Sequence, residues 1–151
     1  MSTVERFWKE ARRALGADAP QEPPQAWAFG DSPELADELL ALVLEGVKTA
    51  TCDALWRFEF DGEPLPQPGD LSIILDGAGR PRCLLETTEI RIMPMHEVDA
   101  AFAYDEGEGD RSWDDWHAAH VRYFSRTLPE IGKQFEPAMP LVLERFRLRY
   151  A

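Results

Sequence analysis

The chain has 151 residues and a formal net charge of −12, with 16 Lys and Arg against 28 Asp and Glu, and 44% of its residues are hydrophobic. This length and apolar share fit one globular domain with a single core and exclude a disordered chain. The acidity argues against an extended nucleic-acid-binding surface, because neutralising phosphates requires clustered Lys and Arg. We therefore expect no binding to double-stranded DNA.

The sequence also lacks a run of about 18 apolar residues, and its start carries charges where a signal peptide would be apolar. We expect a cytoplasmic protein with no membrane association. Its two cysteines, Cys52 and Cys83, are too few for a disulfide framework, so we expect both to be reduced and structural.

The first predicted element is a helix over residues 3–15. Ser2 and Glu5 form a capping-box pattern, apolar residues recur at helical spacing, and Gly16 supplies the stop. The Pro-rich stretch that follows has almost nothing to bury and is typical of a stiff linker. These patterns predict an N-terminal helix and linker over 1–26 and the main domain over 27–151.

Within the main domain, helix signals alternate with strand signals. Helices are predicted from Ser32 to Gly46 and from Ser112 to just before Pro129, each with a Ser cap and one apolar face. Strands are predicted from Ala50 onward and over 71–75, 81–93 and 141–150. This mixed order indicates an α+β domain, with a small curled sheet or barrel flanked by helices.

Lys48 is the first candidate functional residue. Lysine is scarce in this chain, and the run from Gly46 to Thr51 places a cation and a hydroxyl three residues apart at a helix exit. The two groups can converge if the turn at Gly46 is tight. The alternative is structural, because a Lys near a helix C-terminus also complements the helix dipole.

The region 97–115 is the most acidic part of the chain, with Arg111 as its only base. Its glycine-punctuated loop can be read in three ways. In the first the loop is only solvated, and in the second it binds a divalent cation through Glu106, Glu108 and Asp110. In the third it supplies the acidic side of a cleft. Arg111 and Ser112 suit a phosphate or carbonyl ligand, although Ser112 equally serves as a helix cap.

Several aromatic and charged residues have both structural and binding interpretations. His117 and His120 share a helix face but lack a third metal ligand at convincing spacing, so packing is favoured and no metal site is expected. Trp56 with the adjacent Arg57 suits a nucleotide base, although Trp residues are more often buried anchors. Glu86 is either a cleft residue or the partner of a nearby Arg.

The pattern Gly-x-Lys-x-x-Thr at 46–51, the segment Leu84 to Thr88, the acidic glycine loop at 106–112 and the ending Leu143-Glu144-Arg145-Phe146 resemble the ASCH domain, the activating-signal-cointegrator homology domain of the PUA-like superfamily. The resemblance covers about 27–150. It implies a PUA-like mixed β-barrel with a cleft beside the Lys motif, and a link to RNA or modified-nucleoside recognition.

Short bacterial members of that family hydrolyse N4-acetylcytidine with a Lys, a Thr and a Glu. The resemblance implies that Lys48, Thr51 and Glu106, with Glu108 as the alternative acid, fill these roles. A Lys48 of lowered pKa would take the Thr51 proton while a carboxylic acid serves the leaving amine. The expected surrounding contacts come from Trp56, Arg57, Glu86, Glu108, Asp110, Arg111 and Ser112.

The expected ligand is therefore a modified nucleoside or a short single-stranded RNA, without a cofactor. Two alternatives stay open. One is an RNA-binding module, including a ribonuclease that uses a divalent cation, and the other is a nucleotide-binding domain without turnover. A homodimer is also compatible with the sequence. Lys48→Arg is expected to leave stability within about 0.5 kcal/mol, as surface substitutions usually do.

Overall fold

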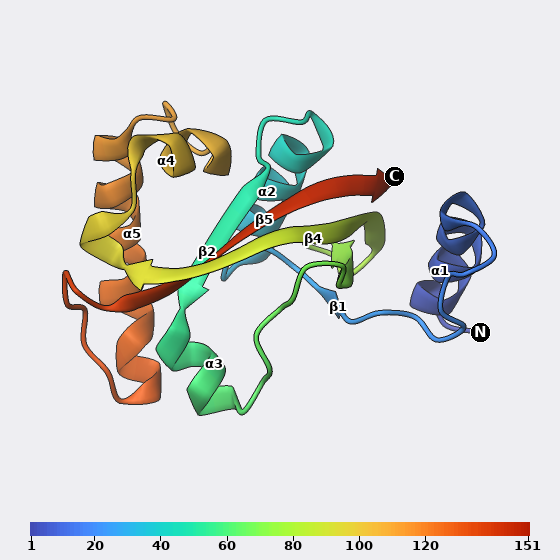
Figure 1. The fold of residues 1–151 in the computed structure, drawn as a ribbon, viewed down its shortest axis with the longest axis horizontal. Helices are drawn as coiled ribbons and strands as arrows, with labels where there is room; N and C mark the ends of the chain where they lie inside the picture. Colours follow the sequence, from blue (N-terminus) through green and yellow to red (C-terminus); the bar gives the residue numbers. More distant parts are fainter.

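The computed structural model describes residues 1–151 and shows one five-stranded sheet with helices around it (Figure 1). The strands lie in the order β1-β3-β4-β5-β2. β1 pairs with β3 in parallel, and the other neighbours are antiparallel. The strands are β1 (Ala26–Trp27), β2 (Ala50–Ala54), β3 (Leu71–Leu75), β4 (Pro81–Pro94) and β5 (Pro140–Tyr150).

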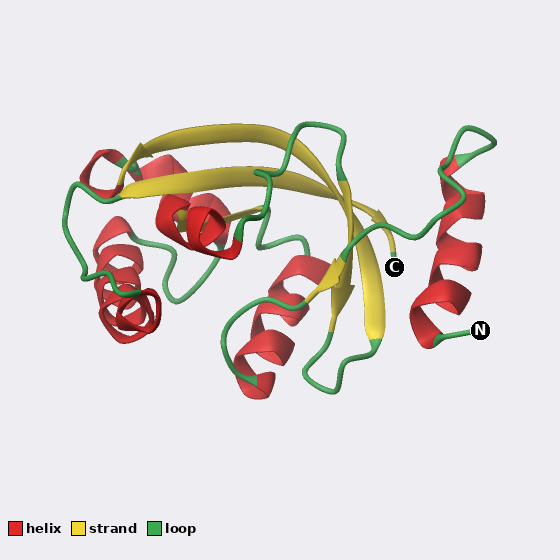
Figure 2. Cartoon of the chain, turned by 90° about the horizontal axis from the view of Figure 1, so that it is seen from below, coloured by secondary structure: helices red, strands yellow, loops and turns green.

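The predicted α+β class is confirmed, but the predicted barrel does not close. β1 and β2 are the two edges of the sheet and do not pair with each other. The long strands β4 and β5 are bent instead (Figure 2), with register shifts near Leu84 and between Thr87 and Glu89. Such irregularities bend a ladder and increase its twist, so the sheet wraps around the helices without closing.

The helices are α1 (Thr3–Leu15), α2 (Pro33–Leu44), α3 (Leu55–Asp61), α4 (Ala100–Glu106) and α5 (Trp113–Thr127), with short 3₁₀ turns at Met95–Glu97 and Leu128–Ile131. Ser2, Ser32 and Ser112 cap α1, α2 and α5 as the sequence predicts. The short helices α3 and α4 were not predicted. None of these helices combines the length and apolar character that crossing a bilayer requires.

Three apolar clusters hold the elements together. Alternating residues of β3 and β4 face opposite sides, so that Ile73 and Leu84 pack with α1 while Ile74 and Leu85 pack with α2. The largest cluster joins α4 and α5 to the far halves of the strands, through side chains such as Phe102. Figure 1 accordingly shows α1 at the opposite end of the molecule from α4 and α5.

The predicted N-terminal helix forms and packs against the sheet. Trp8 and Ala11 are buried against Ile73 and Leu84, and Val4, Phe7 and Leu15 surround this contact. The indole Nε1 of Trp8 also donates a hydrogen bond to the carbonyl of Gln21, at 3.2 Å. α1 therefore fixes both a face of the sheet and the linker that follows it.

We predict that Trp8→Ala lowers the free energy of unfolding by about 3–5 kcal/mol, because it removes a buried aromatic side chain and leaves a cavity. Lys9→Ala, at the exposed next position, is the matched control and should change stability by less than about 0.5 kcal/mol. Urea unfolding of both variants measures this difference. Equal stability of the two variants would show that α1 does not contribute to the core.

Candidate functional site

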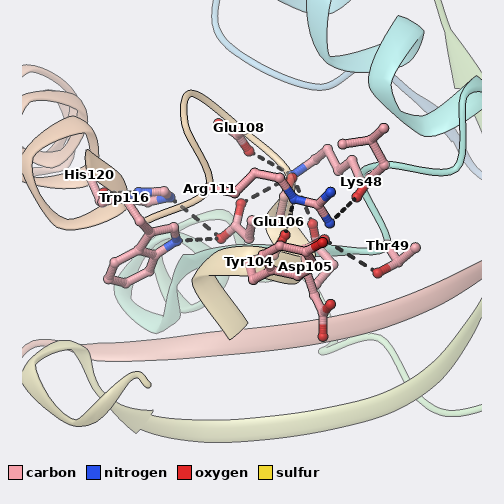
Figure 3. A network of polar contacts seen from close by, with 11 residues as sticks. Lys48, Thr49, Tyr104, Asp105, Glu106, Glu108, Arg111, Trp116 and His120 are labelled. Atoms are coloured by element: carbon pink, nitrogen blue, oxygen red, sulfur yellow. Dashed lines mark hydrogen bonds and ion pairs between the residues drawn. The ribbon is translucent and has the colours of Figure 1, made fainter. Parts of the chain in front are cut away.

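Lys48 lies at the turn between α2 and β2, and its side chain is completely enclosed. Gly46, with φ 79°, reverses the chain after α2. The Lys48 ammonium then donates to the carbonyl of Ala50 at 2.8 Å and contacts two carboxylates, Glu106 at 3.1 Å and Glu108 at 2.7 Å (Figure 3). The turn at Gly46 thus directs the cation into the protein, and Lys48 does more than complement the helix dipole.

The acidic loop reaches Lys48 because of a close backbone contact. Gly107 has φ 73° and ends α4, and a Cβ atom at this position would lie 2.7 Å from the carbonyl oxygen of Val47. Arg111 secures the same contact, since its guanidinium donates to the carbonyls of Tyr104 and Val47. A glycine at 107 therefore permits the loop to place Glu106 and Glu108 on either side of the ammonium group.

Glu106 is the most enclosed carboxylate of the site, with 1% of its surface exposed. Its Oε2 contacts Lys48, while its Oε1 accepts a hydrogen bond from the Trp116 indole at 3.0 Å. The His120 Nε2 lies 3.6 Å from the same Oε1. Trp116 and His120 are one turn apart on α5, so a single helix face supplies both groups.

The pKa shifts follow from these contacts. Burial alone would raise the pKa of Glu106, but the charge of Lys48, together with His120, lowers it to about 2. Burial raises the pKa of Glu108, and the neighbouring Glu106 charge adds to this effect against the attraction of Lys48. The pKa values of the two carboxyl groups are thus shifted in opposite directions, although both groups contact the same ammonium group.

The expected lowered pKa of Lys48 is wrong. Burial acts to lower its pKa, but the Coulombic attraction and hydrogen bonds of Glu106 and Glu108 outweigh burial and raise it. Lys48 is therefore a cation at neutral pH and cannot accept the Thr51 proton in this arrangement. The expectation that Lys48→Arg behaves as a surface substitution is also wrong, because the side chain has no exposed surface.

A cavity of about 960 Å³ lies on the other side of the two carboxylates from Lys48. Among the expected site residues, Thr51, Arg57, Glu106 and Glu108 line it. Lys48 does not line it and lies behind Glu106 and Glu108. Thr51 and both carboxyl groups therefore line one cavity, and Lys48 lies behind the two carboxyl groups.

The other expected contact residues lie outside the lining of this cavity. Trp56 packs against the α4–α5 core, and Glu86 pairs with Arg147 and Arg149 of β5. Asp110 accepts from the backbone N–H of Ser112, and Ser112 caps α5. Arg111 stacks on Tyr104 with its guanidinium carbon 3.5 Å from the ring centroid. Local packing and ion pairing account for these residues.

The structure does not bring together the three carboxylates that the divalent-cation interpretation of the loop requires, those of Glu106, Glu108 and Asp110. The ammonium group of Lys48 already lies between Glu106 and Glu108, and Asp110 is turned toward the start of α5. The ammonium group therefore occupies the position that a divalent cation would take between Glu106 and Glu108.

Several cavity residues were not expected from the sequence. Cys52 and His120 line the cavity beside Glu106, whereas both were predicted to be structural. The aromatic residues Trp27, Phe29 and Tyr123 and the carboxyl groups of Asp53 and Glu144 also line it. The sequence shows that Trp116 and His120 share one helix face, but it does not show that this face contacts Glu106.

The cysteines are free, as expected, and Cys83 is buried among the apolar side chains that pack with α2. Burial raises the pKa of Cys83 to about 12. Burial and the neighbouring Glu106 charge raise the pKa of Cys52 well above its ordinary value. Both thiols are therefore protonated at neutral pH. Only Cys52 borders the cavity.

Comparison with known proteins gives a consistent family match. The sequence model of the ASCH domain matches residues 25–150. A crystal structure of an Enterococcus faecalis protein shares 38% identity and a TM-score of 0.88, covering 98% of this chain and 88% of that one. The ASCH domain structure from Lactobacillus crispatus shares 30% identity and a TM-score of 0.89, covering 100% of this chain and 97% of that one.

A third structure, of a hypothetical protein, shares 13% identity and a TM-score of 0.51, covering 83% of this chain and 98% of that one, and so supports the fold alone. The search of curated proteins produced no match.

We predict that Lys48→Met lowers the free energy of unfolding by about 3–5 kcal/mol, because removing one partner of a buried ion pair leaves its carboxylates uncompensated. Lys133→Met removes the charge of an exposed lysine and is the matched control. Denaturant unfolding at neutral pH compares the variants. A loss at Lys48 no larger than that at Lys133 would contradict the buried ion cluster.

Proposed function

Because the chain belongs to the ASCH domain family, we propose that it is a hydrolase that acts on a modified nucleoside or a related small amide in the 960 Å³ cavity. The observation that carries this proposal is that a hydroxyl and two carboxyl groups line one cavity, with a buried ammonium behind the carboxyl groups. A soluble binding module needs no such buried charge cluster, which is costly to desolvate.

The cavity suits a small, uncharged heterocycle. Its volume falls in the range of about 300–1,000 Å³ that small-molecule sites occupy. Trp27 and Tyr123 offer aromatic surfaces on which a base can stack. Two of its arginines are already paired, Arg57 with Glu130 and Arg126 with Asp31. With so much carboxylate and so little free positive charge, a single nucleoside is favoured over a long RNA.

Thr51 is the nucleophile in this proposal and Glu108 is the group that moves its proton. Both line the cavity, and the Glu108 side chain is 30% exposed whereas that of Glu106 is enclosed. The Thr51 Oγ attacks the acyl carbon while its proton passes to the Glu108 carboxylate. The C–N bond then breaks and the amine takes that proton. Water next attacks the acyl-Thr51 ester as Glu108 accepts the water proton, the ester C–O bond breaks, and Glu108 returns the proton to the Thr51 oxygen.

Lys48 is a positioning residue in this scheme. It holds Glu106 and Glu108 by direct contacts, and its charge favours the ionised form of the carboxylate that must accept a proton. The family resemblance implies that Lys48 is the base, whereas in this proposal Lys48 has an electrostatic role. The conservative Lys48→Arg change keeps this charge but introduces a larger head into a fully enclosed space.

We predict that Thr51→Val abolishes, and Glu108→Gln lowers by at least about 100-fold, the hydrolysis of an acylated nucleoside, consistent with the 10²–10⁴-fold contribution of acid–base groups. Two neighbours that lie outside the cavity are matched controls. Thr49→Val and Asp110→Asn should retain turnover within about threefold.

The assay is mass spectrometry of a panel of acylated and unmodified nucleosides and short RNAs, with and without divalent cation and chelator. Deacylation that requires Thr51 supports the proposal. Cleavage of RNA without deacylation, or full turnover by Thr51→Val, would contradict it and favour the nuclease or binding alternatives. The salt dependence gives a separate test, because RNA binding weakens steeply with salt.

A further inference from the structure

Three side chains from three separate elements converge beside the cavity. Cys52 comes from β2, Glu106 from the end of α4 and His120 from α5. One ligand atom from each, a sulfur, an oxygen and a nitrogen, lies within 4.8 Å of the other two. All three residues also line the cavity. We infer that this cluster is a binding site for a zinc ion, with one coordination position open toward the cavity.

The hydrogen bonding of His120 presents a free ligand atom to the cluster. Its Nδ1 lies 2.7 Å from the carbonyl oxygen of Trp116, and a carbonyl can only accept a hydrogen bond. Nδ1 therefore carries a proton, which leaves Nε2, on the Glu106 side of the ring, as the atom available to a metal ion. Metal-ligating histidines almost always donate their other ring N–H in this way, which fixes the tautomer and the ring orientation.

Stacking further restrains the imidazole. The His120 and Trp116 rings lie 4.3 Å apart between centroids, with an interplanar angle of 27°. Trp116 in turn donates to the Oε1 of Glu106. Two of the three ligands are thus oriented by the same indole before any ion binds.

The donor set selects the type of cation. Zinc binds Cys, His and carboxylate ligands at about 2.0–2.3 Å and forms catalytic sites with three protein ligands and one open position. Tetrahedral ligands at those distances lie roughly 3.5 Å apart, so each separation in the cluster must contract by roughly 1.3 Å at most. Magnesium and calcium prefer oxygen ligands only, so a thiol and an imidazole argue against them.

The surrounding charges also suit a divalent ion with a thiolate. When zinc binds, the Cys52 S–H bond breaks, the S–Zn bond forms, and the proton leaves to solvent. The ion with the Cys52 thiolate and the Glu106 carboxylate is then neutral, and Lys48 keeps Glu108 as its partner. Lys48 contacts the other oxygen of Glu106, Oε2, so the atom that faces His120 remains available.

This inference does not depend on the proposed hydrolysis, because it concerns an ion and is tested without substrate. The protein is first freed of metal with a chelator and then titrated with Co²⁺, a spectroscopic substitute for zinc. We expect one equivalent to bind with a sulfur-to-metal charge-transfer absorption band, and Zn²⁺ to displace it. Calorimetric titration with Zn²⁺ alone measures the same stoichiometry.

The chain provides matched control variants. His120→Gln and Cys52→Ser should each weaken Zn²⁺ binding at least about tenfold, and Cys52→Ser should abolish the charge-transfer band. His117→Gln changes the histidine that stacks on Trp113 of the same helix, and Cys83→Ala changes the other buried thiol. Both controls should keep the affinity and the band.

A thermal measurement covers the case in which a variant is destabilised. Saturating Zn²⁺ should raise the Tm of the wild type and of His117→Gln, but not that of His120→Gln, by the ordinary linkage of ligand binding to stability. The absence of a charge-transfer band in the wild type would overturn the inference. Equal Zn²⁺ affinity in His120→Gln and His117→Gln would also overturn it, because binding would then lie elsewhere on this acidic protein.

Discussion

The buried ammonium of Lys48 is the interaction on which the rest of the site depends. A charge with no exposed surface is tolerated only when its partners compensate for the lost hydration. Here the partners are Glu106 and Glu108, which lie far along the chain at the end of α4 and in the loop that follows it. Folding must therefore bring the α2–β2 turn and the α4–α5 loop together, and the same contact fixes one wall of the cavity.

Much of the fold could be predicted because local signals agreed with the final structure. Serine caps, the apolar faces of α2 and α5, and the alternating pattern of β5 all report local preferences that packing did not override. The two short helices were missed for physical reasons. In α3, Trp56, Phe58 and Phe60 alternate as in a strand, and α4, within the acidic segment, spans only Ala100–Glu106, which is too short to show a repeated helical period. Barrel closure depends on how far the sheet bends, which no local pattern encodes.

The site could be predicted only where one short segment carried it. Lys48 and Thr51 were found because the turn at Gly46 lies in the same segment. The sequence left Glu86 with two interpretations, a cleft residue or the partner of an Arg, because it could not show which residues lie opposite it. The structure supports the second, with Arg147 opposite Glu86 on β5 and Arg149 also paired with it. Cys52 and His120 were missed for the complementary reason: each has an ordinary structural interpretation alone, and only the position of Glu106 between their elements gives them a shared chemistry.

The segment that precedes the family match also shapes the cavity. Residues of the linker, among them Pro20, Glu22 and Pro24, line it together with Trp8 of α1. Arg12 donates to the carbonyls of Ala19 and Pro20, and Trp8 donates to that of Gln21, so α1 holds the linker backbone in place through side chains that also pack on the sheet. The linker itself has few apolar contacts and cannot stabilise this wall alone. The volume available to a ligand therefore depends on α1, although α1 contributes none of the charged groups around Lys48.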